Sequence, residues 1–297
     1  MLKKMSKKIS LLLVLVLALS VVLVACGEKP EEPEGPGQVE EPGEGENGGE
    51  ENGEEPSGIK TVKDIQDAGK IVLGTSADYP PFEFHALING KDEIVGFDIE
   101  IAKYIAEKLG VELEINDMDF DILVAALGAG RVDIVIAGMN PDPERDANFS
   151  DIYYEANLAV LVPKGNPLGI NKEADLKDKK IGVQIGTTQE DVANEAGGKE
   201  VLSLASNYDL VMNLKTNKVD CVIMETPVAE AFAKANDDVI MVEGLEIDSG
   251  TDGVAIALKT GSDELTEKIN EILAEIKVKG LIEKWMAEAD ELSQEEI

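Results

Sequence analysis

An α/β fold made of two similar lobes is predicted by three features of the sequence. From residue 59 onward, short apolar runs alternate with helical stretches, the pattern of α/β domains with parallel strands. This part has about 240 residues, enough for one large domain or two smaller lobes. Residues 127–136 (LGAGRVDIVI) and 214–223 (LKTNKVDCVI) also share the spacing of Leu, a basic residue, Val-Asp and Val-Ile. Two lobes built alike would explain this repeat, and a chance likeness between two helix-to-strand turns is the alternative.

The N-terminus has the features of a secretion signal. Four lysines lie within the first eight residues, and an apolar run from Leu11 to Val24 follows, which is short for a membrane span. The sequence Leu23-Val24-Ala25-Cys26 resembles a bacterial lipobox, in which the cysteine is lipidated and becomes the new N-terminus. The alternative is an ordinary signal peptide that contains a cysteine. We therefore expect residues 1–26 to be a lipoprotein signal peptide with its lipobox, and the mature protein to be extracytoplasmic and lipid-anchored to the cell membrane through Cys26.

Residues 27–58 predict a disordered acidic linker, because they are almost entirely Glu, Gly, Pro and Asn and cannot build a core. The formal net charge of the whole chain is −33. A strongly anionic protein is repelled by nucleic acid and by acidic lipid headgroups, so neither is an expected partner. The second cysteine, Cys221, lies in an apolar strand and is expected to be a small buried residue rather than half of a disulfide.

The apolar pattern predicts individual strands and helices. The expected strands are Ile71–Thr75, Val132–Ala137, Lys180–Ile185 and Val219–Met224, and the expected helices are Ile99–Leu109, Asp121–Gly128, Thr188–Ala196, Leu210–Thr216 and Leu265–Lys279. Ligands of open parallel sheets bind beyond the carboxyl ends of the strands. This rule selects residues 76–79, 138–140, 184–188 and Glu225 as candidate site residues.

The segment that follows the strand ending at Ala137 predicts a carboxylate site. Asp142 suits a helix N-cap and Pro143 the first helical position, so we expect a short helix with Arg145 in its first turn. Free backbone amides and a guanidinium fork could converge there on a carboxylate. The alternative is an arginine paired with a surface glutamate.

Other candidates lie at the ends of later strands. Thr187 and Glu190 have the spacing of a capping box, which predicts a helix N-terminus facing the same cleft. Glu225 ends an apolar strand, where a carboxylate needs a cation or solvent. A ligand ammonium would serve, and a lysine of the same chain or simple exposure are the alternatives. Tyr79 and Phe120 could flank a ligand side chain beside the cleft, or belong to the core.

Several motifs in the same order resemble the polar amino-acid-binding family of ABC importers. They are residues 74–84 (GTSADYPPFEF), 96–101 (GFDIEI), 137–145 (AGMNPDPER), 149–151 (FSD) and 182–188 (GVQIGTT). The resemblance implies a two-lobed periplasmic-binding-protein fold, in which each lobe is a mostly parallel sheet flanked by helices and two strands form the hinge. It implies lobe 1 over residues 59–152 and 253–297, lobe 2 over 158–247, and hinge segments at 153–157 and 248–252.

The resemblance also implies a ligand and its contacts. Arg145 would bind the α-carboxylate of an amino acid, assisted by Asn140 and by the backbone of Gly138 and Thr188. Tyr79 and Phe120 would flank its side chain, and Glu225 would bind the α-amino group where the family often has Asp. Ser76 and Gln184 complete the implied site. The position of Ser76 is acidic in some relatives, which argues mildly against a strongly basic ligand, and the run between Arg145 and Phe149 is about two residues shorter than usual in the family.

Other functions find less support in the sequence. An amino-acid dehydratase-like enzyme would have to use Glu225 or Glu83 as acid or base, because His85 is the one histidine and offers no relay. Asp117, Asp119 and Asp121 match the first ligands of an EF-hand loop, but Ile122 stands where that loop needs Gly. We therefore expect no metal, cofactor or catalytic residue. A ligand sensor would need an output domain that the sequence lacks, so the expected partners are separate ABC permease subunits, and the protein itself is expected to be monomeric.

Overall fold

The first lobe is built on a five-stranded sheet in the order β5-β1-β6-β13-β7. The computed structural model describes residues 58–296, which belong to one compact unit. The strands are β1 (Lys70–Thr75), β5 (Glu112–Asp117), β6 (Ile134–Val135), β7 (Ala147–Phe149) and β13 (Ala257–Lys259). β1 runs parallel to β5 and β6, and β13 runs antiparallel to β6 and β7. The lipobox with Cys26 and nearly all of the predicted linker lie outside the described residues.

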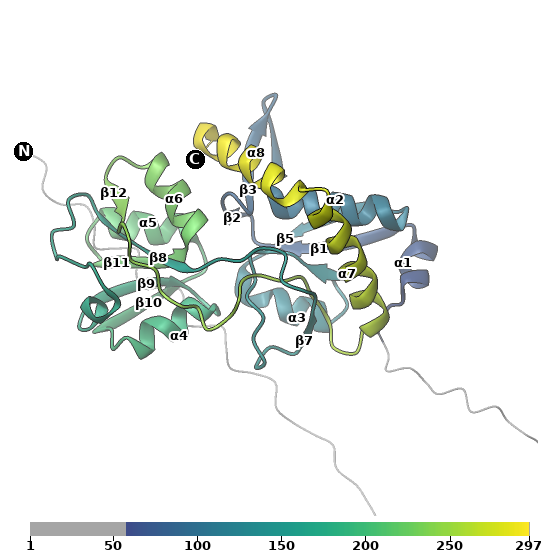
Figure 1. The fold of residues 1–297 in the computed structure, drawn as a ribbon, viewed down its shortest axis with the longest axis horizontal. Coiled ribbons are helices and arrows are strands. Elements are labelled where there is room, and N and C mark those ends of the chain that lie inside the picture. The colour runs from purple at the N-terminus through teal and green to yellow at the C-terminus, as the bar shows by residue number, and fades with distance from the viewer. Residues whose placement is uncertain (1–57, 297) are drawn as a thin grey trace, which may run out of the picture. The chain divides into compact units, whose positions relative to one another are not determined.

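Helices and a small second sheet complete this lobe (Figure 1). The antiparallel sheet consists of β2 (Asp78–Tyr79), β3 (Glu83–Ile88) and β4 (Lys91–Val95). The helices are α1 (Val62–Ala68), α2 (Phe97–Leu109), the 3-10 turn η1 (Phe120–Ile122), α3 (Leu123–Gly128), α7 (Asp263–Val278) and α8 (Leu281–Glu296). None of the helices within residues 58–296 is long and apolar enough to cross a membrane.

The second lobe has a sheet of the same plan, in the order β10-β9-β11-β8-β12. Its strands are β8 (Leu158–Pro163), β9 (Lys180–Gln184), β10 (Glu200–Leu204), β11 (Cys221–Glu225) and β12 (Val239–Met241). Its helices are the 3-10 turn η2 (Glu173–Leu176), α4 (Thr188–Glu195), α5 (Asn207–Lys215) and α6 (Thr226–Ala235). In both lobes three parallel strands lie side by side, and the next strand in the sheet is antiparallel to them. This antiparallel strand is β13 in lobe 1 and β8 in lobe 2, and each is the first strand after a crossing segment.

The sequence repeat occupies equivalent places in the two lobes. Each copy runs from the end of a helix, α3 or α5, into the third parallel strand, β6 or β11. The aspartates of the two copies also make the same contact, because Asp133 accepts from Val72 N and Asp220 from Lys180 N, both at 2.8 Å. Each carboxylate thereby fixes the start of the central strand. The shared architecture, rather than chance, accounts for the repeat.

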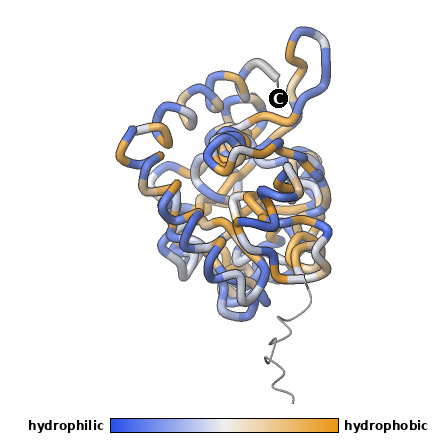
Figure 2. The backbone as a smooth tube through the Cα atoms, turned by 90° about the vertical axis from the view of Figure 1, so that its right-hand side faces the viewer, coloured by the Kyte–Doolittle hydropathy of each residue, from blue (hydrophilic) through white to orange (hydrophobic). Residues whose placement is uncertain are grey.

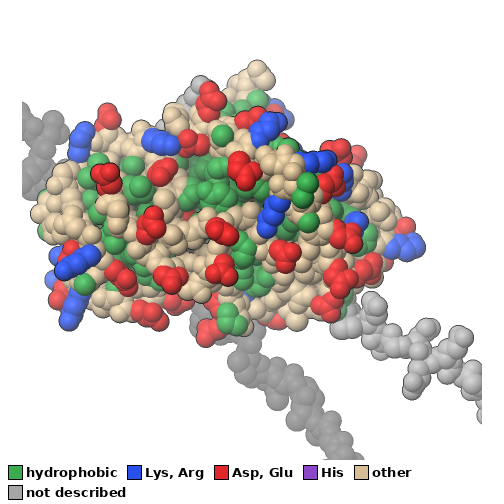
Figure 3. Space-filling model, viewed as in Figure 1, with side chains coloured by type: hydrophobic (Ala, Val, Ile, Leu, Met, Phe, Trp, Pro, Cys, Tyr) green, Lys and Arg blue, Asp and Glu red, His purple; other side chains and the backbone are tan. Residues whose placement is uncertain are grey.

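The chain crosses between the lobes twice, before β8 and after β12. The two crossing segments pair with each other at Tyr154–Val254 and at Leu158–Ile247. Hydrophobic stretches alternate with hydrophilic ones along the chain (Figure 2), as expected for elements that are buried on one side. Acidic side chains are spread over the face shown in Figure 3, in keeping with the large negative charge.

Several predicted elements differ from those observed. The expected strand Val132–Ala137 shrinks to Ile134–Val135, because β13 pairs with only two of its residues. No helix begins at Asp142: residues 141–146 form turns and loop. Within the described residues, three helices and nine strands were not predicted: α1, α6 and α8, the small sheet β2-β3-β4, and the strands β5, β7, β8, β10, β12 and β13. The remaining expected strands and helices are confirmed to within three residues at each end.

Candidate ligand-binding site

A small cavity lies between the lobes, at the carboxyl ends of strands from both sheets. Lobe 1 contributes Tyr79, Phe120, Ala137, Gly138, Asn140 and Arg145 to its wall, and lobe 2 contributes Gln184, Thr187, Thr188, Gln189 and Glu225. The lobes touch around it. Thr188 Oγ1 donates to Asn140 Oδ1 at 3.0 Å, Arg145 Nη2 donates to the Gly186 carbonyl at 2.9 Å, and Glu225 N donates to the Tyr79 hydroxyl at 3.2 Å. The two lobes are therefore closed on each other.

Arg145 is held by a turn rather than by a helix. The Asp142 carboxylate accepts from Glu144 N at 2.8 Å, and the Asp142 carbonyl accepts from Arg145 N at 3.0 Å. The Arg145 guanidinium lies 5.4 Å from the centre of the Phe120 ring, a cation–π contact. Its Nε is buried and has no hydrogen-bond partner among the described residues. Burial lowers the pKa of Arg145, yet a guanidinium stays charged at neutral pH, so the site presents a cation with a free donor.

Glu225 supplies the opposite charge from the other lobe. It is 1% exposed at the end of β11, and its Oε2 accepts from Gln189 Nε2 at 2.6 Å. Its Oε1 is buried and has no partner among residues 58–296. Burial raises the pKa of Glu225 to about 8. None of the described lysines pairs with it, and it is not exposed, so both simpler interpretations of this carboxylate are excluded for the described part of the chain.

Tyr79, Gly138 and Asn140 shape the lobe 1 side of the cavity. A Cβ at Gly138, whose φ is +54°, would lie 3.1 Å from Tyr79 Cδ1, so the aromatic ring needs glycine there. Gly138 N donates to Asp98 Oδ2 at 2.9 Å and is not free for a ligand. Asn140 Nδ2 donates to Thr251 Oγ1 and to the Gly253 carbonyl, both at 3.1 Å. Asn140 thus ties this wall to the second crossing segment.

The structure brings eight of the nine predicted binding residues together. Ser76 is the exception: it is buried at the end of β1 but is not part of the cavity wall. Thr187 lies in the predicted range 184–188, whereas Ala137 and Gln189 were not predicted as site residues. Thr187 is the N-cap of α4, but its Oγ1 donates to the Gln184 carbonyl at 2.7 Å, and Glu190 accepts from Gly186 N at 3.0 Å. The expected capping box is therefore wrong, although the helix begins where it was predicted.

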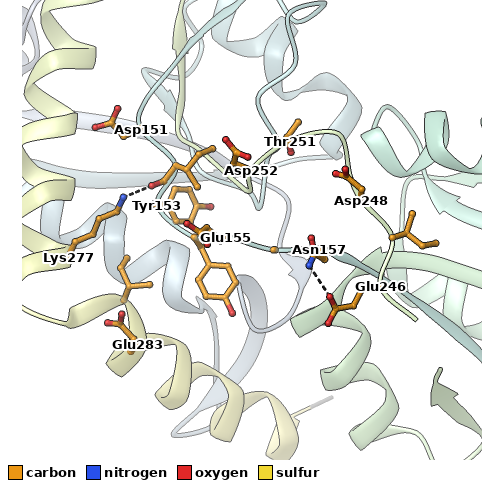
Figure 4. A pocket seen from close by; sticks show the side chains of 15 residues that line it. Asp151, Tyr153, Glu155, Asn157, Glu246, Asp248, Thr251, Asp252, Lys277 and Glu283 are labelled. Atoms are coloured by element: carbon orange, nitrogen blue, oxygen red, sulfur yellow. Dashed lines mark hydrogen bonds between the residues drawn. The ribbon is translucent and has the colours of Figure 1, made fainter. Parts of the chain in front are cut away.

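A larger cavity lies along the crossing segments and is acidic (Figure 4). Its carboxylates are Asp151, Glu155, Glu246, Asp248, Asp252 and Glu283, and Lys277 is its one basic side chain. Lys277 Nζ donates to the Ile152 carbonyl at 2.5 Å, and Asn157 Nδ2 donates to Glu246 at 3.1 Å. This cavity lacks a buried pair of opposite charges that could hold a zwitterion. Within the described residues, no group of three His, Cys, Asp or Glu could hold a metal ion.

The two-lobed fold, together with Arg145 and Glu225 in the small cavity between the lobes, is that of a solute-binding protein. Residues 71–288 match the family of bacterial extracellular solute-binding proteins, family 3, and the chain belongs to this family. Membership places the folded part outside the cytoplasm. The family consists of substrate-binding proteins of transporters, which are not enzymes.

The relatives are named for amino acids. The chain is 41% identical over 220 residues to the arginine-binding extracellular protein ArtP of Bacillus subtilis (strain 168), covering 72% of this chain and 84% of that one. It is 35% identical to ABC transporter arginine-binding protein 1 of Escherichia coli (strain K12), covering 73% and 89%. Among solved structures, it resembles the amino acid ABC transporter substrate-binding protein AbpA from Streptococcus pneumoniae bound to L-arginine. That match has a TM-score of 0.74 and 36% identity, and covers 78% of this chain and 98% of that one.

Proposed function

We propose that this chain binds one L-α-amino acid between its lobes and delivers it to an ABC importer. One observation carries the proposal: the Arg145 guanidinium of lobe 1 and the Glu225 carboxyl group of lobe 2 lie on the wall of one cavity, and each has a buried polar atom without a partner among the described residues. An α-carboxylate would accept from Arg145, and an α-ammonium would donate to Glu225 Oε1. Buried charges are stable only when paired, so a zwitterion fits this site better than an uncharged solute.

The two charges also suggest how the ligand is captured. Because they come from different lobes, only a closed cleft lets one amino acid contact both. A ligand that binds the closed form better than the open form shifts the population toward closure. The paired crossing segments, expected to bend at residues 153–157 and 248–252, would be the hinge.

Arginine is the first ligand to test. The similarity to arginine-binding relatives supports it, and a guanidinium can stack on the faces of Tyr79 and Phe120. The non-acidic residue at position 76 weighs less against a basic ligand than the sequence suggested, because Ser76 is not part of the cavity wall. A micromolar affinity corresponds to about −8 kcal/mol, which lies within the ceiling for a ligand of roughly ten heavy atoms.

Thermal-shift screening of purified protein against the twenty standard amino acids, followed by calorimetry, tests the function. We expect saturable binding of L-arginine or of another L-amino acid, with one ligand per chain. D-arginine is the matched control, because its α-carboxylate and α-ammonium cannot both meet Arg145 and Glu225 while the side chain keeps its place. Absence of binding to all twenty would overturn the proposal.

We also propose that the chain is a non-catalytic monomer, anchored through a lipid on Cys26. An enzyme of this fold would need an acid or base that its substrate can reach. Glu83 is fully buried and is not part of the cavity wall. Glu225 is part of that wall, but the one histidine, His85, is exposed on β3 beside Asp92 and Asp117, so it offers Glu225 no relay. Incubation of the protein with arogenate, followed by product analysis, distinguishes a dehydratase from a binding protein.

A further inference from the structure

The two lobes also meet at a contact that lies outside the ligand cavity. Asp78, in β2 of lobe 1, accepts hydrogen bonds from Asn207 N at 2.6 Å and from Asn207 Nδ2 at 3.1 Å. Asn207 is the first residue of α5 in lobe 2 and is 1% exposed. Neither residue is part of the cavity wall.

The start of α5 needs an acceptor from outside the helix. The first backbone N–H groups of a helix have no partner within it. The N-cap, Ser206, satisfies one of them, because its hydroxyl accepts from Asp209 N at 3.3 Å. Asn207 N is satisfied by Asp78 instead, from the opposite lobe. When the lobes separate, this donor and the Asn207 amide must turn to water.

Strand β2 reaches two elements of lobe 2 at once. Successive side chains of a strand point to opposite faces, and here Tyr79 points to the cavity while Asp78 points to α5. The Tyr79 hydroxyl accepts from Glu225 N at 3.2 Å. Two neighbouring residues thus join lobe 2 through β11 and through α5, and only Tyr79 is placed to touch a ligand.

We propose that Asp78 is a positioning residue that latches the closed lobes through Asn207 and thereby sets the affinity and the release rate of the ligand without contacting it. The inference rests on the proposed function, since it concerns the closed form that holds the amino acid. Closure transfers two donors of Asn207 from water to Asp78. Opening must break both hydrogen bonds before the ligand can leave.

The acceptor atoms of Asp78 matter more to this latch than its charge. Burial raises the pKa of Asp78 to about 6, although Asn207 donates two hydrogen bonds to it, and the charges of Asp117 and Asp119 raise the pKa further. The negative charge of Asp78 is therefore disfavoured in the closed structure. Asparagine at this position would keep an oxygen for Asn207 N, and the Asn207 amide can turn to offer its own oxygen to the new NH₂ group. Alanine would leave both donors buried without a partner, which is costly.

The first experiment measures L-arginine binding by calorimetry and its dissociation by stopped flow, at pH 8. We expect Asp78→Ala to lower the affinity at least about tenfold, mostly through faster dissociation, and Asp78→Asn to stay within about threefold of the wild type. Glu107→Ala is the control, because it removes an exposed charge of the same lobe, on α2, that lies outside the cavity wall and, within the described residues, makes no side-chain contact with lobe 2. Its affinity should change by less than about twofold.

A second variant tests the latch from the other lobe. Asn207→Pro removes both donors, and proline is favoured at the first position of a helix, after the extended conformation that Ser206 already has. We expect a loss of affinity similar to that of Asp78→Ala, and no further loss in the double variant, because one interaction is being removed. Asn207→Pro also keeps the test open if Asp78→Ala does not fold.

Three outcomes would count against the latch, and they are distinguishable. Wild-type affinity and dissociation rate in both Asp78→Ala and Asn207→Pro would overturn it and leave the proposed function standing. Additive losses of ligand affinity in the double variant would show a general structural role instead. The same conclusion would follow if, without ligand, each single variant lost as much thermal stability as it loses in binding free energy. Failure of the wild type to bind L-arginine or any other standard amino acid would overturn the proposed function, and this inference with it.

Discussion

Replacing Arg145 by alanine tests the chemistry of the site most directly. The half-buried guanidinium lies 5.4 Å from the centre of the Phe120 ring, and its buried Nε has no partner in the described part of the chain. Losing one half of a buried, hydrogen-bonded charge pair costs about 2 to 5 kcal/mol. At about 1.4 kcal/mol for each factor of ten, the affinity for the ligand should fall by roughly 30-fold to several thousand-fold.

The fold should tolerate this change. In the closed structure the guanidinium donates one hydrogen bond, to the Gly186 carbonyl of the other lobe, so its removal takes little from lobe 1. A partly buried cation without a carboxylate partner is itself unfavourable. We therefore expect thermal unfolding of ligand-free Arg145→Ala to match or exceed that of the wild type.

Calorimetry with L-arginine checks the prediction, with Arg131→Ala as control. Arg131 is the other arginine of the sequence; it is exposed and lies outside the cavity wall. Arg145→Lys tests whether the geometry of the guanidinium matters as well as its charge, because an ammonium cannot donate two parallel hydrogen bonds to one carboxylate. An affinity for Arg145→Ala within about threefold of the wild type would refute the role of this residue.

Three further predictions concern other parts of the chain. Ligand affinity should rise as the pH increases from 6 towards 8, because burial raises the pKa of Glu225 to about 8 and the ammonium needs the ionised carboxylate; Glu225→Gln should bind weakly and show no such slope in calorimetry. Burial also raises the pKa of Glu83 well above its usual value, so its neutral form favours folding and the free energy of unfolding should fall as the pH rises. Glu83→Gln, which stays neutral, should be more stable than the wild type in urea denaturation at pH 8; equal curves would contradict this. Cys26→Ala should lose fatty-acid labelling and appear in the medium or remain unprocessed, and persistent labelling would exclude the lipobox.

Local sequence predicted several of the regular elements and the chemistry available to the site. Short apolar runs predicted β1, β9 and β11, which are buried along nearly their whole length, and apolar residues at helical spacing predicted α7. Strand ends then selected the region of Gly138, Gln184 and Glu225, since polar residues after a parallel strand meet at one edge of the sheet. The repeat around Asp133 and Asp220 also predicted two lobes of like design.

Predictions from local sequence were wrong where the same residues suit two different local structures. Asp142 and Pro143 suit both the start of a helix and a turn, and the chain must turn there because β7 follows within a few residues and pairs with β13 from the far end of the sequence. The same partner shortens β6 to two residues. The spacing of Thr187 and Glu190 suits a capping box, but Gly186 N and the Ser203 hydroxyl compete for the carboxylate.

Only the tertiary structure decided which of the candidate residues face one another. Glu225 could have been exposed at its strand end, but the closed lobes bury it opposite Arg145, and Ser76, close to Tyr79 in sequence, falls outside the cavity wall. The contact of Asp78 with Asn207 joins residues 129 positions apart. No local pattern encodes such a contact, because it depends on how two separately folded lobes are brought together by the two crossing segments.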